Sequence, residues 1–186
     1  MKRPDREPLH RGLLGALIVL LVAAVVPHFL HLHIWITLFF LAAVTLRVVC
    51  MLWPRLLPGR LLLFVLALAG LANVILNYPV LISGETAIAL MTSMVGLKLL
   101  EIHTRRDLFI VVFIGFFLLA TQFLFNQDML MVGYVILLTI ALTGVLLENS
   151  RHRPSGNPAR SLGTALTLLL QAIPVMLVLF AFFHRL

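Results

Sequence analysis

Long apolar runs, separated by short polar connections, recur along the whole chain. There are seven, at residues 12–30, 34–53, 61–77, 86–102, 108–125, 129–147 and 162–183. At about 1.5 Å per residue the first run reaches about 28 Å as a helix, which is close to the hydrocarbon thickness of a bilayer. The sequence therefore predicts an all-α, polytopic transmembrane helix bundle of about seven spans. The integral membrane domain covers residues 12–186 and follows a basic tail at residues 1–11.

Composition leaves little room for a water-soluble alternative. Of the 186 residues, 62% are hydrophobic and 11% are charged, whereas soluble domains average about 45–50% apolar and about 25% charged residues. A soluble fold of this size could not bury so much apolar surface. Because the runs recur without a polar half, we expect one membrane domain.

Basic residues collect beside every second connection, which predicts an orientation. The opposite connections, around His31, Pro79 and Gln127, hold no Lys or Arg, and Arg185 is the sole basic residue on that side. The positive-inside rule then places the N-terminus in the cytoplasm and the C-terminus outside. Thirteen of the 14 Lys and Arg residues lie on the cytoplasmic side: Lys2, Arg3, Arg6, Arg11, Arg47, Arg55, Arg60, Lys98, Arg105, Arg106, Arg151, Arg153 and Arg160.

The basic residues fit two alternative roles less well. The net charge of +7 is compatible with nucleic-acid binding, but the charges lie between apolar runs, without aromatic interleaving or a nucleic-acid motif, so we expect no nucleic-acid partner. The basic tail before the first run also resembles a signal peptide. That run is long for a signal peptide, and residues 23–25 form a poor cleavage site, which favours an uncleaved span.

The connection between the fourth and fifth runs holds more charged residues than any other connection between two spans. Its charged residues are Lys98, Glu101, Arg105, Arg106 and Asp107. Their spacing makes Lys98, Glu101 and Arg105 neighbours if the helix continues through them. Asp107 is placed to cap the start of the next span. A structural ion pair that orients the connection is favoured over a transport site, because charges at an interface need no special cause.

Polar side chains in the outer thirds of two spans form a second candidate site. Asn73 and Asn77 share one face of the third span, and Thr121 and Gln122 lie near the end of the fifth. Hydrogen bonding between helices is the favoured role, since it is the commoner use of polar side chains in membranes. The alternative is a polar outer vestibule, as in a small transporter or lipid-handling protein.

The sequence offers no catalytic, cofactor or metal motif. Intramembrane hydrolysis requires paired aspartates, a Ser with a His, or a zinc-binding helix, and no acidic residue falls at the centre of a span. The cluster of His28, His31 and His33 lacks a fourth ligand. Cys50 lies in an apolar run and is interpreted as a small buried hydrophobe. Arg47, near the end of the second span, is predicted to extend toward lipid headgroups.

Several runs of sequence resemble the N-terminal membrane domain of bacterial TgpA-type transglutaminase-like proteins. The resemblance extends from about Leu61 to Leu186, and the first two spans match only in character. The runs that carry it are LKLLE at 97–101, TRRD at 104–107, GFFLLATQFLFNQ at 115–127 and LQAIPVMLVLF at 170–180. One departure is His184, where the family pattern has a proline.

This resemblance implies a non-catalytic anchor or interaction module in a bacterial inner membrane, with its C-terminus in the periplasm. In the family, a periplasmic transglutaminase-like domain carries a Cys-His-Asp triad, and this chain stops where that domain is expected to begin. No triad residue carries over, because Cys50 lies within a span. The expected partners are the lipid bilayer and a periplasmic transglutaminase-like domain, in the same chain or a separate one.

Overall fold

The computed structural model describes residues 11–53, 59–80, 83–125, 128–150 and 158–184. The predicted basic tail before Arg11 lies outside these residues. So do six of the basic residues used to predict the orientation, together with Arg185: Lys2, Arg3, Arg6, Arg55, Arg151 and Arg153.

The described residues form helices and no strands, which confirms the predicted all-α class. In chain order the α-helices are α1 (Arg11–Val25), α2 (Ile34–Leu52), α3 (Arg60–Asn77), α4 (Gly84–Glu101), α5 (Arg105–Thr121), α6 (Met129–Ser150) and α7 (Pro158–His184). Short 3-10 turns, η2 (Val26–Leu30) and η4 (Gln122–Leu124), extend α1 and α5. Pro27 in η2 has no backbone N–H to donate, which accounts for the change from α to 3-10 geometry there.

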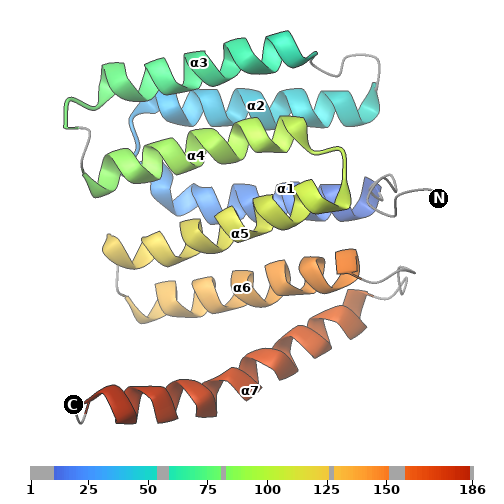
Figure 1. Ribbon diagram of the computed structural model, residues 1–186, viewed down its shortest axis with the longest axis vertical. Helices are drawn as coiled ribbons and strands as arrows, with labels where there is room; N and C mark the ends of the chain where they lie inside the picture. The colour runs from blue at the N-terminus through green and yellow to red at the C-terminus, as the bar shows by residue number, and fades with distance from the viewer. Residues whose placement is uncertain (1–10, 54–58, 81–82, 126–127, 151–157, 185–186) are drawn as a thin grey trace.

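The α-helices lie side by side and alternate in direction (Figure 1). Helices α2, α4 and α6 finish, and α3, α5 and α7 start, at the end of the bundle where α1 begins. Helices α1, α3 and α5 finish, and α2, α4 and α6 start, at the end where α7 finishes. We call these the basic end and the opposite end. Five described helical segments are long and apolar enough to cross a membrane: Arg11–Leu30, Ile34–Leu52, Arg105–Leu124, Met129–Ser150 and Arg160–Phe182. The apolar part of α3 is shorter, at Leu61–Asn77, and α4 carries more polar residues.

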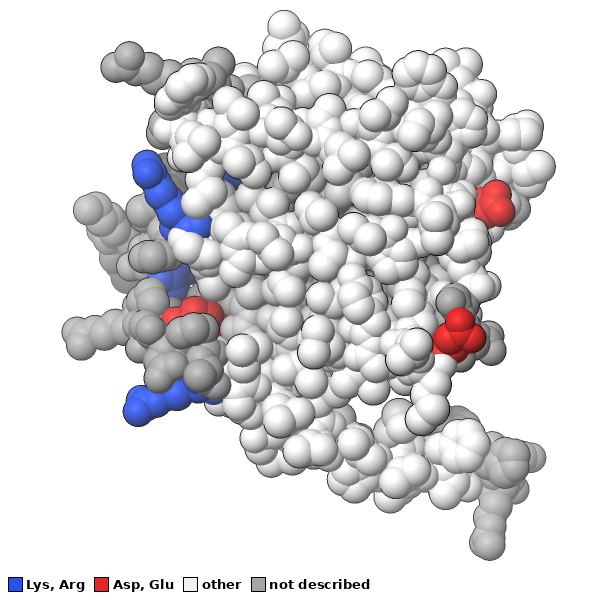
Figure 2. Space-filling view, turned by 180° about the vertical axis from the view of Figure 1, so that it is seen from behind, with Lys and Arg blue, Asp and Glu red and all other residues white. Residues whose placement is uncertain are grey.

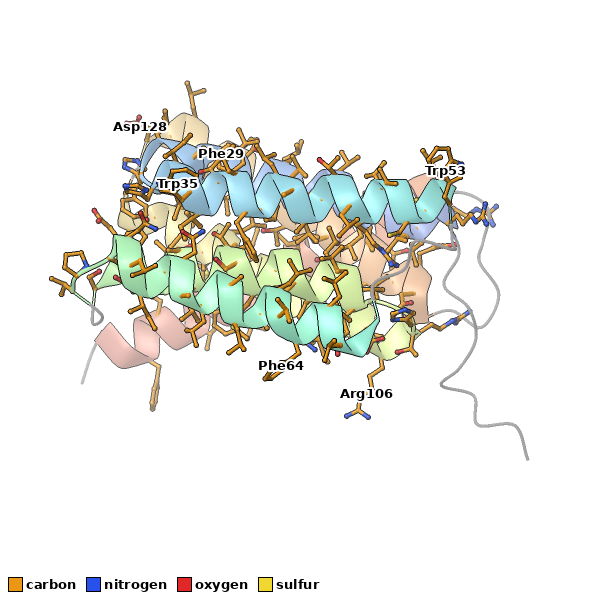
Figure 3. All side chains as sticks on the ribbon, turned by 90° about the horizontal axis from the view of Figure 1, so that it is seen from above. Phe29, Trp35, Trp53, Phe64, Arg106 and Asp128 are labelled. Atoms are coloured by element: carbon orange, nitrogen blue, oxygen red, sulfur yellow. The ribbon has the colours of Figure 1, made fainter. Side chains whose placement is uncertain are left out.

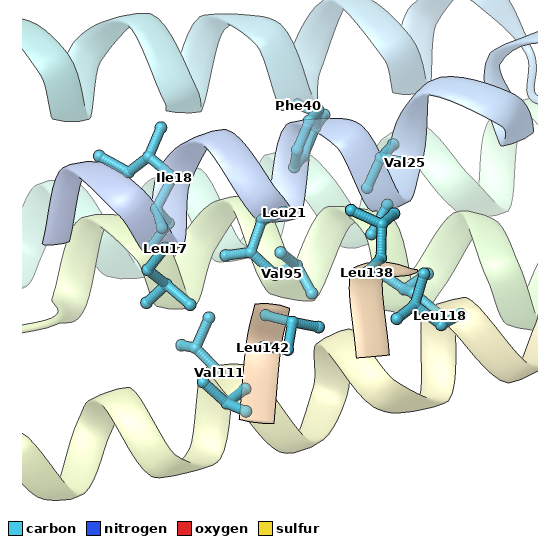
Figure 4. Packing of buried hydrophobic residues seen from close by; sticks show 14 of the residues in the cluster. Leu17, Ile18, Leu21, Val25, Phe40, Val95, Val111, Leu118, Leu138 and Leu142 are labelled. Carbon is cyan, nitrogen blue, oxygen red and sulfur yellow. The ribbon is translucent and has the colours of Figure 1, made fainter. Parts of the chain in front are cut away.

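Helix α4 is the central helix and packs against α2, α3 and α5. Gly96 permits the close contact with α2, because a Cβ atom there would lie 3.3 Å from the Cβ of Ala43. On the other side of the core, α1 packs against α5 and α6. Figure 4 shows the resulting cluster of buried side chains, which includes Leu21, Val95 and Leu142.

Helix α7 packs mainly against α6, and most of its surface is exposed. It begins beside α6 and diverges from it toward its C-terminal end (Figure 1). Ser161 and Ala165 are buried, whereas all described side chains from Leu170 to Val178 are exposed. The helix continues through Pro174 without interruption. The apolar surface of its second half is therefore left for lipid or another protein to cover.

The two ends of the bundle differ in charge. In Figure 2 the visible Lys and Arg residues lie along one edge of the molecule. The charged residues visible at the opposite edge are all acidic. Figure 3 places Trp53 and Arg106 at the basic end and Trp35 and Asp128 at the opposite end. Both tryptophans are exposed and lie about 27 Å apart along α2. This spacing fits the two aromatic belts of a bilayer about 30 Å thick.

Candidate functional site

The charged connection at the basic end is a sharp break between two helices. Helix α4 stops at Glu101, and Ile102 is extended with ψ 115°. The ammonium group of Lys98 pairs with the Glu101 carboxylate at 2.6 Å. Lys98, Glu101 and Arg105 were expected to be neighbours only if one helix continued through all three. The helix does not continue, because α5 begins as a new helix at Arg105.

A capping box fixes the start of α5. The Thr104 hydroxyl accepts a hydrogen bond from the Asp107 backbone N–H at 3.3 Å, and the Asp107 carboxylate accepts from the N–H of Thr104 at 2.9 Å. The same carboxylate accepts from the N–H of His103 at 3.1 Å. These bonds satisfy amides that a helix start leaves free, which accounts for the break between α4 and α5.

Arg105 joins the start of α5 to the end of α6. Its guanidinium donates to the Asn149 carbonyl at 3.3 Å, and the Asn149 side chain donates to the Arg105 carbonyl at 3.0 Å. Asn149 is buried and was not among the residues singled out in the sequence. The sequence feature that could have identified it is a side-chain amide at the end of an apolar run, next to a basic connection.

Arg47 points into the bundle, and the prediction that it extends to the headgroups is wrong. Its side chain is 7% exposed, and Nη2 donates to the Ile102 carbonyl at 2.7 Å. Ile102 follows the last residue of α4, where helix carbonyls lack partners and the helix dipole is negative. The cation is therefore attracted to the end of a neighbouring helix.

A buried polar cluster at the opposite end links α1 to α5. His28 Nε2 lies 3.0 Å from the Thr121 hydroxyl, which donates to the Leu118 carbonyl at 2.8 Å. The side-chain amide of Gln122 donates to the Ala24 carbonyl at 3.2 Å and also contacts His28 Nδ1. These contacts join the end of α1 to the end of α5 within the apolar interior.

The other two polar candidates belong to a separate group. Asn73 donates from its side chain to the Trp35 carbonyl at 3.0 Å, which ties α3 to α2. Asn77 donates to both the backbone and side-chain oxygens of Asn73 at 2.8 Å. Gln122 is 2% exposed. The Asn73 contact joins α3 to α2, whereas the Asn77 contacts lie within α3, and no described hydrogen bond joins these two residues to Thr121 or Gln122.

The three histidines near the opposite end have different surroundings. His28 is buried in the polar cluster, and the His31 ring stacks on Phe125 with centroids 4.4 Å apart. The backbone N–H of His33 donates to the Tyr78 hydroxyl at 3.0 Å. Within the described part of the chain, His, Cys, Asp and Glu residues form no group of three that could hold a metal ion.

Comparison with known proteins identifies the family. The model of the family described as the TgpA N-terminal domain matches residues 16–186, and this match includes the first two spans. A protein-glutamine gamma-glutamyltransferase of Pseudomonas aeruginosa is 35% identical over 174 residues, which cover 92% of this chain. The matched region is 26% of that relative's length, so this chain corresponds to about a quarter of it. No solved structure matches the chain. The chain belongs to the TgpA N-terminal domain family of transglutaminase-related proteins.

Proposed function

We propose that this chain is the membrane anchor of a transglutaminase-family protein and has no catalytic activity of its own. It lies in a bacterial inner membrane with its N-terminus in the cytoplasm and its C-terminus in the periplasm. The support is the family match over residues 16–186 together with the long apolar helices. The relative is named as a glutamyltransferase, and most of its length lies outside the matched region. The catalytic domain is expected there, in the same chain or a separate one.

The observation that carries the orientation is the uneven placement of charge. The described basic residues Arg11, Lys98, Arg105, Arg106 and Arg160 lie at the basic end. At the opposite end lie Glu85, in the first turn of α4, and Asp128, before α6, and the described connections there hold no Lys or Arg. Positive charge is retained on the cytoplasmic side of bacterial membranes. Under this rule α7 leaves the membrane on the periplasmic face.

The polar residues support an anchor rather than a conduit. The amides of Asn73 and Gln122 each bind a carbonyl of another helix. Bonds of this kind fix helix positions in a membrane. An anchor requires helices that keep fixed positions relative to one another.

Reporter fusions and an activity assay test this proposal. Alkaline phosphatase, which is active only in the periplasm, is fused after Leu186, and a fluorescent protein that matures in the cytoplasm is fused at the same point in a parallel strain. We expect phosphatase activity and no fluorescence. Cytoplasmic fluorescence alone would overturn the orientation. The purified chain is expected to transfer no acyl group from a glutamine peptide to an amine, and turnover by the chain would overturn the non-catalytic role.

A further inference from the structure

Helix α5 presents a continuous exposed stripe on the outside of the bundle. Arg106, Ile110, Phe113 and Phe117 recur at intervals of three and four residues and therefore share one face. The three apolar side chains are 41%, 57% and 61% exposed. From Arg106 to Phe117 the stripe is about 16 Å long, which is about half of a 30 Å hydrocarbon core. Its length therefore matches the acyl chain of a lipid in one leaflet.

The neighbouring helix α4 has a matching surface. Leu90 and Met94 are exposed, and Lys98 lies one turn further toward the basic end on the same face. Helices α4 and α5 are antiparallel neighbours. Lys98, in the last turn of α4, and Arg106, in the first turn of α5, therefore lie at the same end of two neighbouring helices.

Arg106 is a cation of this connection whose guanidinium is accessible to an anion from outside the chain. Its side chain is exposed and projects away from the bundle (Figure 3). No described residue forms a hydrogen bond or ion pair with its guanidinium. The nearby carboxylates are already engaged, because Glu101 pairs with Lys98 and Asp107 accepts from backbone amides.

We propose that this surface binds one anionic phospholipid of the leaflet at the basic end. Arg106 binds the phosphate with paired N–H donors, and the ammonium group of Lys98 adds a second contact. One acyl chain lies along Ile110, Phe113 and Phe117. A zwitterionic lipid fits the apolar stripe equally well but gains less from the cations. The site therefore selects by headgroup charge.

The test compares lipid binding by two variants that each remove one exposed arginine from the same end. The purified chain in a neutral detergent is titrated with phosphatidylglycerol or phosphatidylethanolamine, and bound lipid is counted by native mass spectrometry. The unmodified chain is expected to bind phosphatidylglycerol about fivefold more tightly, which is the effect of ~1 kcal/mol for one basic residue near anionic lipid. Arg106→Gln is expected to remove this preference. Arg160→Gln, on α7, is expected to keep it.

Three results would overturn the proposal. In the first, Arg106→Gln keeps the preference while its circular dichroism and unfolding temperature match those of the unmodified chain. In the second, Arg160→Gln loses as much preference as Arg106→Gln, which shows that attraction depends on net charge alone. In the third, soluble glycerol phosphate displaces phosphatidylglycerol, which shows a phosphate site without a contribution from the apolar stripe.

Discussion

At the scale of single residues, some buried polar side chains have hydrogen-bond partners and others have none among the described residues. The first kind includes His28 and Gln122, which link α1 to α5 in the apolar interior. The second kind includes the hydroxyls of Thr37, Thr92 and Ser93, which are buried without a hydrogen-bond partner among the described residues. The two kinds respond in opposite ways to substitution by an apolar side chain.

Gln122→Leu is expected to destabilise the bundle by about 1–3 kcal/mol, because the buried His28 ring and the Ala24 carbonyl each lose a hydrogen-bond partner. The double variant His28→Leu with Gln122→Leu is expected to lose less than the sum of the two single variants. Unfolding temperatures of the purified variants in one detergent measure the difference. Additive losses would show that the two side chains do not depend on each other.

Thr92→Val is expected to stabilise the chain by about 1 kcal/mol, since it removes a buried hydroxyl without a partner and keeps the side-chain shape. Thr143→Val is the matched control, because that hydroxyl donates to the Thr139 carbonyl at 2.8 Å. The control is expected to be neutral or slightly destabilised. A lower unfolding temperature for Thr92→Val would contradict the prediction and indicate a water molecule bound at this hydroxyl.

At the scale of elements, the break between α4 and α5 sets the positions of two helices that pack closely. Thr104 and Asp107 terminate one helix and start the next, and Arg47 holds the end of α4. Asp107→Ala is expected to cost about 1 kcal/mol, the usual loss for a removed cap. Amide hydrogen exchange at His103 and Thr104 should become faster, with the amides in the middle of α5 unchanged. Uniform acceleration along α5 would show that the carboxylate supports more than the helix start.

The helices could be predicted from apolar runs, but the partners of their polar residues could not. Period and length identify an apolar helix without saying which face meets which neighbour. Arg47 illustrates the difficulty, because a basic residue near a span end is expected to reach the headgroups, and only the position of α4 shows that a carbonyl lies closer. The pair of Arg105 and Asn149 likewise joins residues 44 positions apart. The Asp107 cap could be predicted from the sequence because capping joins residues only three positions apart.

At the scale of the whole molecule, the two ends of the bundle differ more in charge than in shape, and this difference predicts how the topology can be changed. Replacing Glu85 and Asp128 by Lys adds positive charge to two connections at the opposite end. Because Lys residues in short connections resist translocation, part of the population is expected to insert inverted or with a span excluded. The phosphatase activity of a fusion after Leu186 should therefore fall.

The matched control for this change replaces the same residues by Gln and Asn. It removes both acidic groups without adding positive charge, and acidic residues contribute little to orientation. Phosphatase activity in the control should equal that of the unmodified chain, at equal amounts of protein in the membrane. If the Lys variant and the control behave alike, positive charge does not set the orientation. The packing of α4 within the bundle would then have to determine which end faces the cytoplasm.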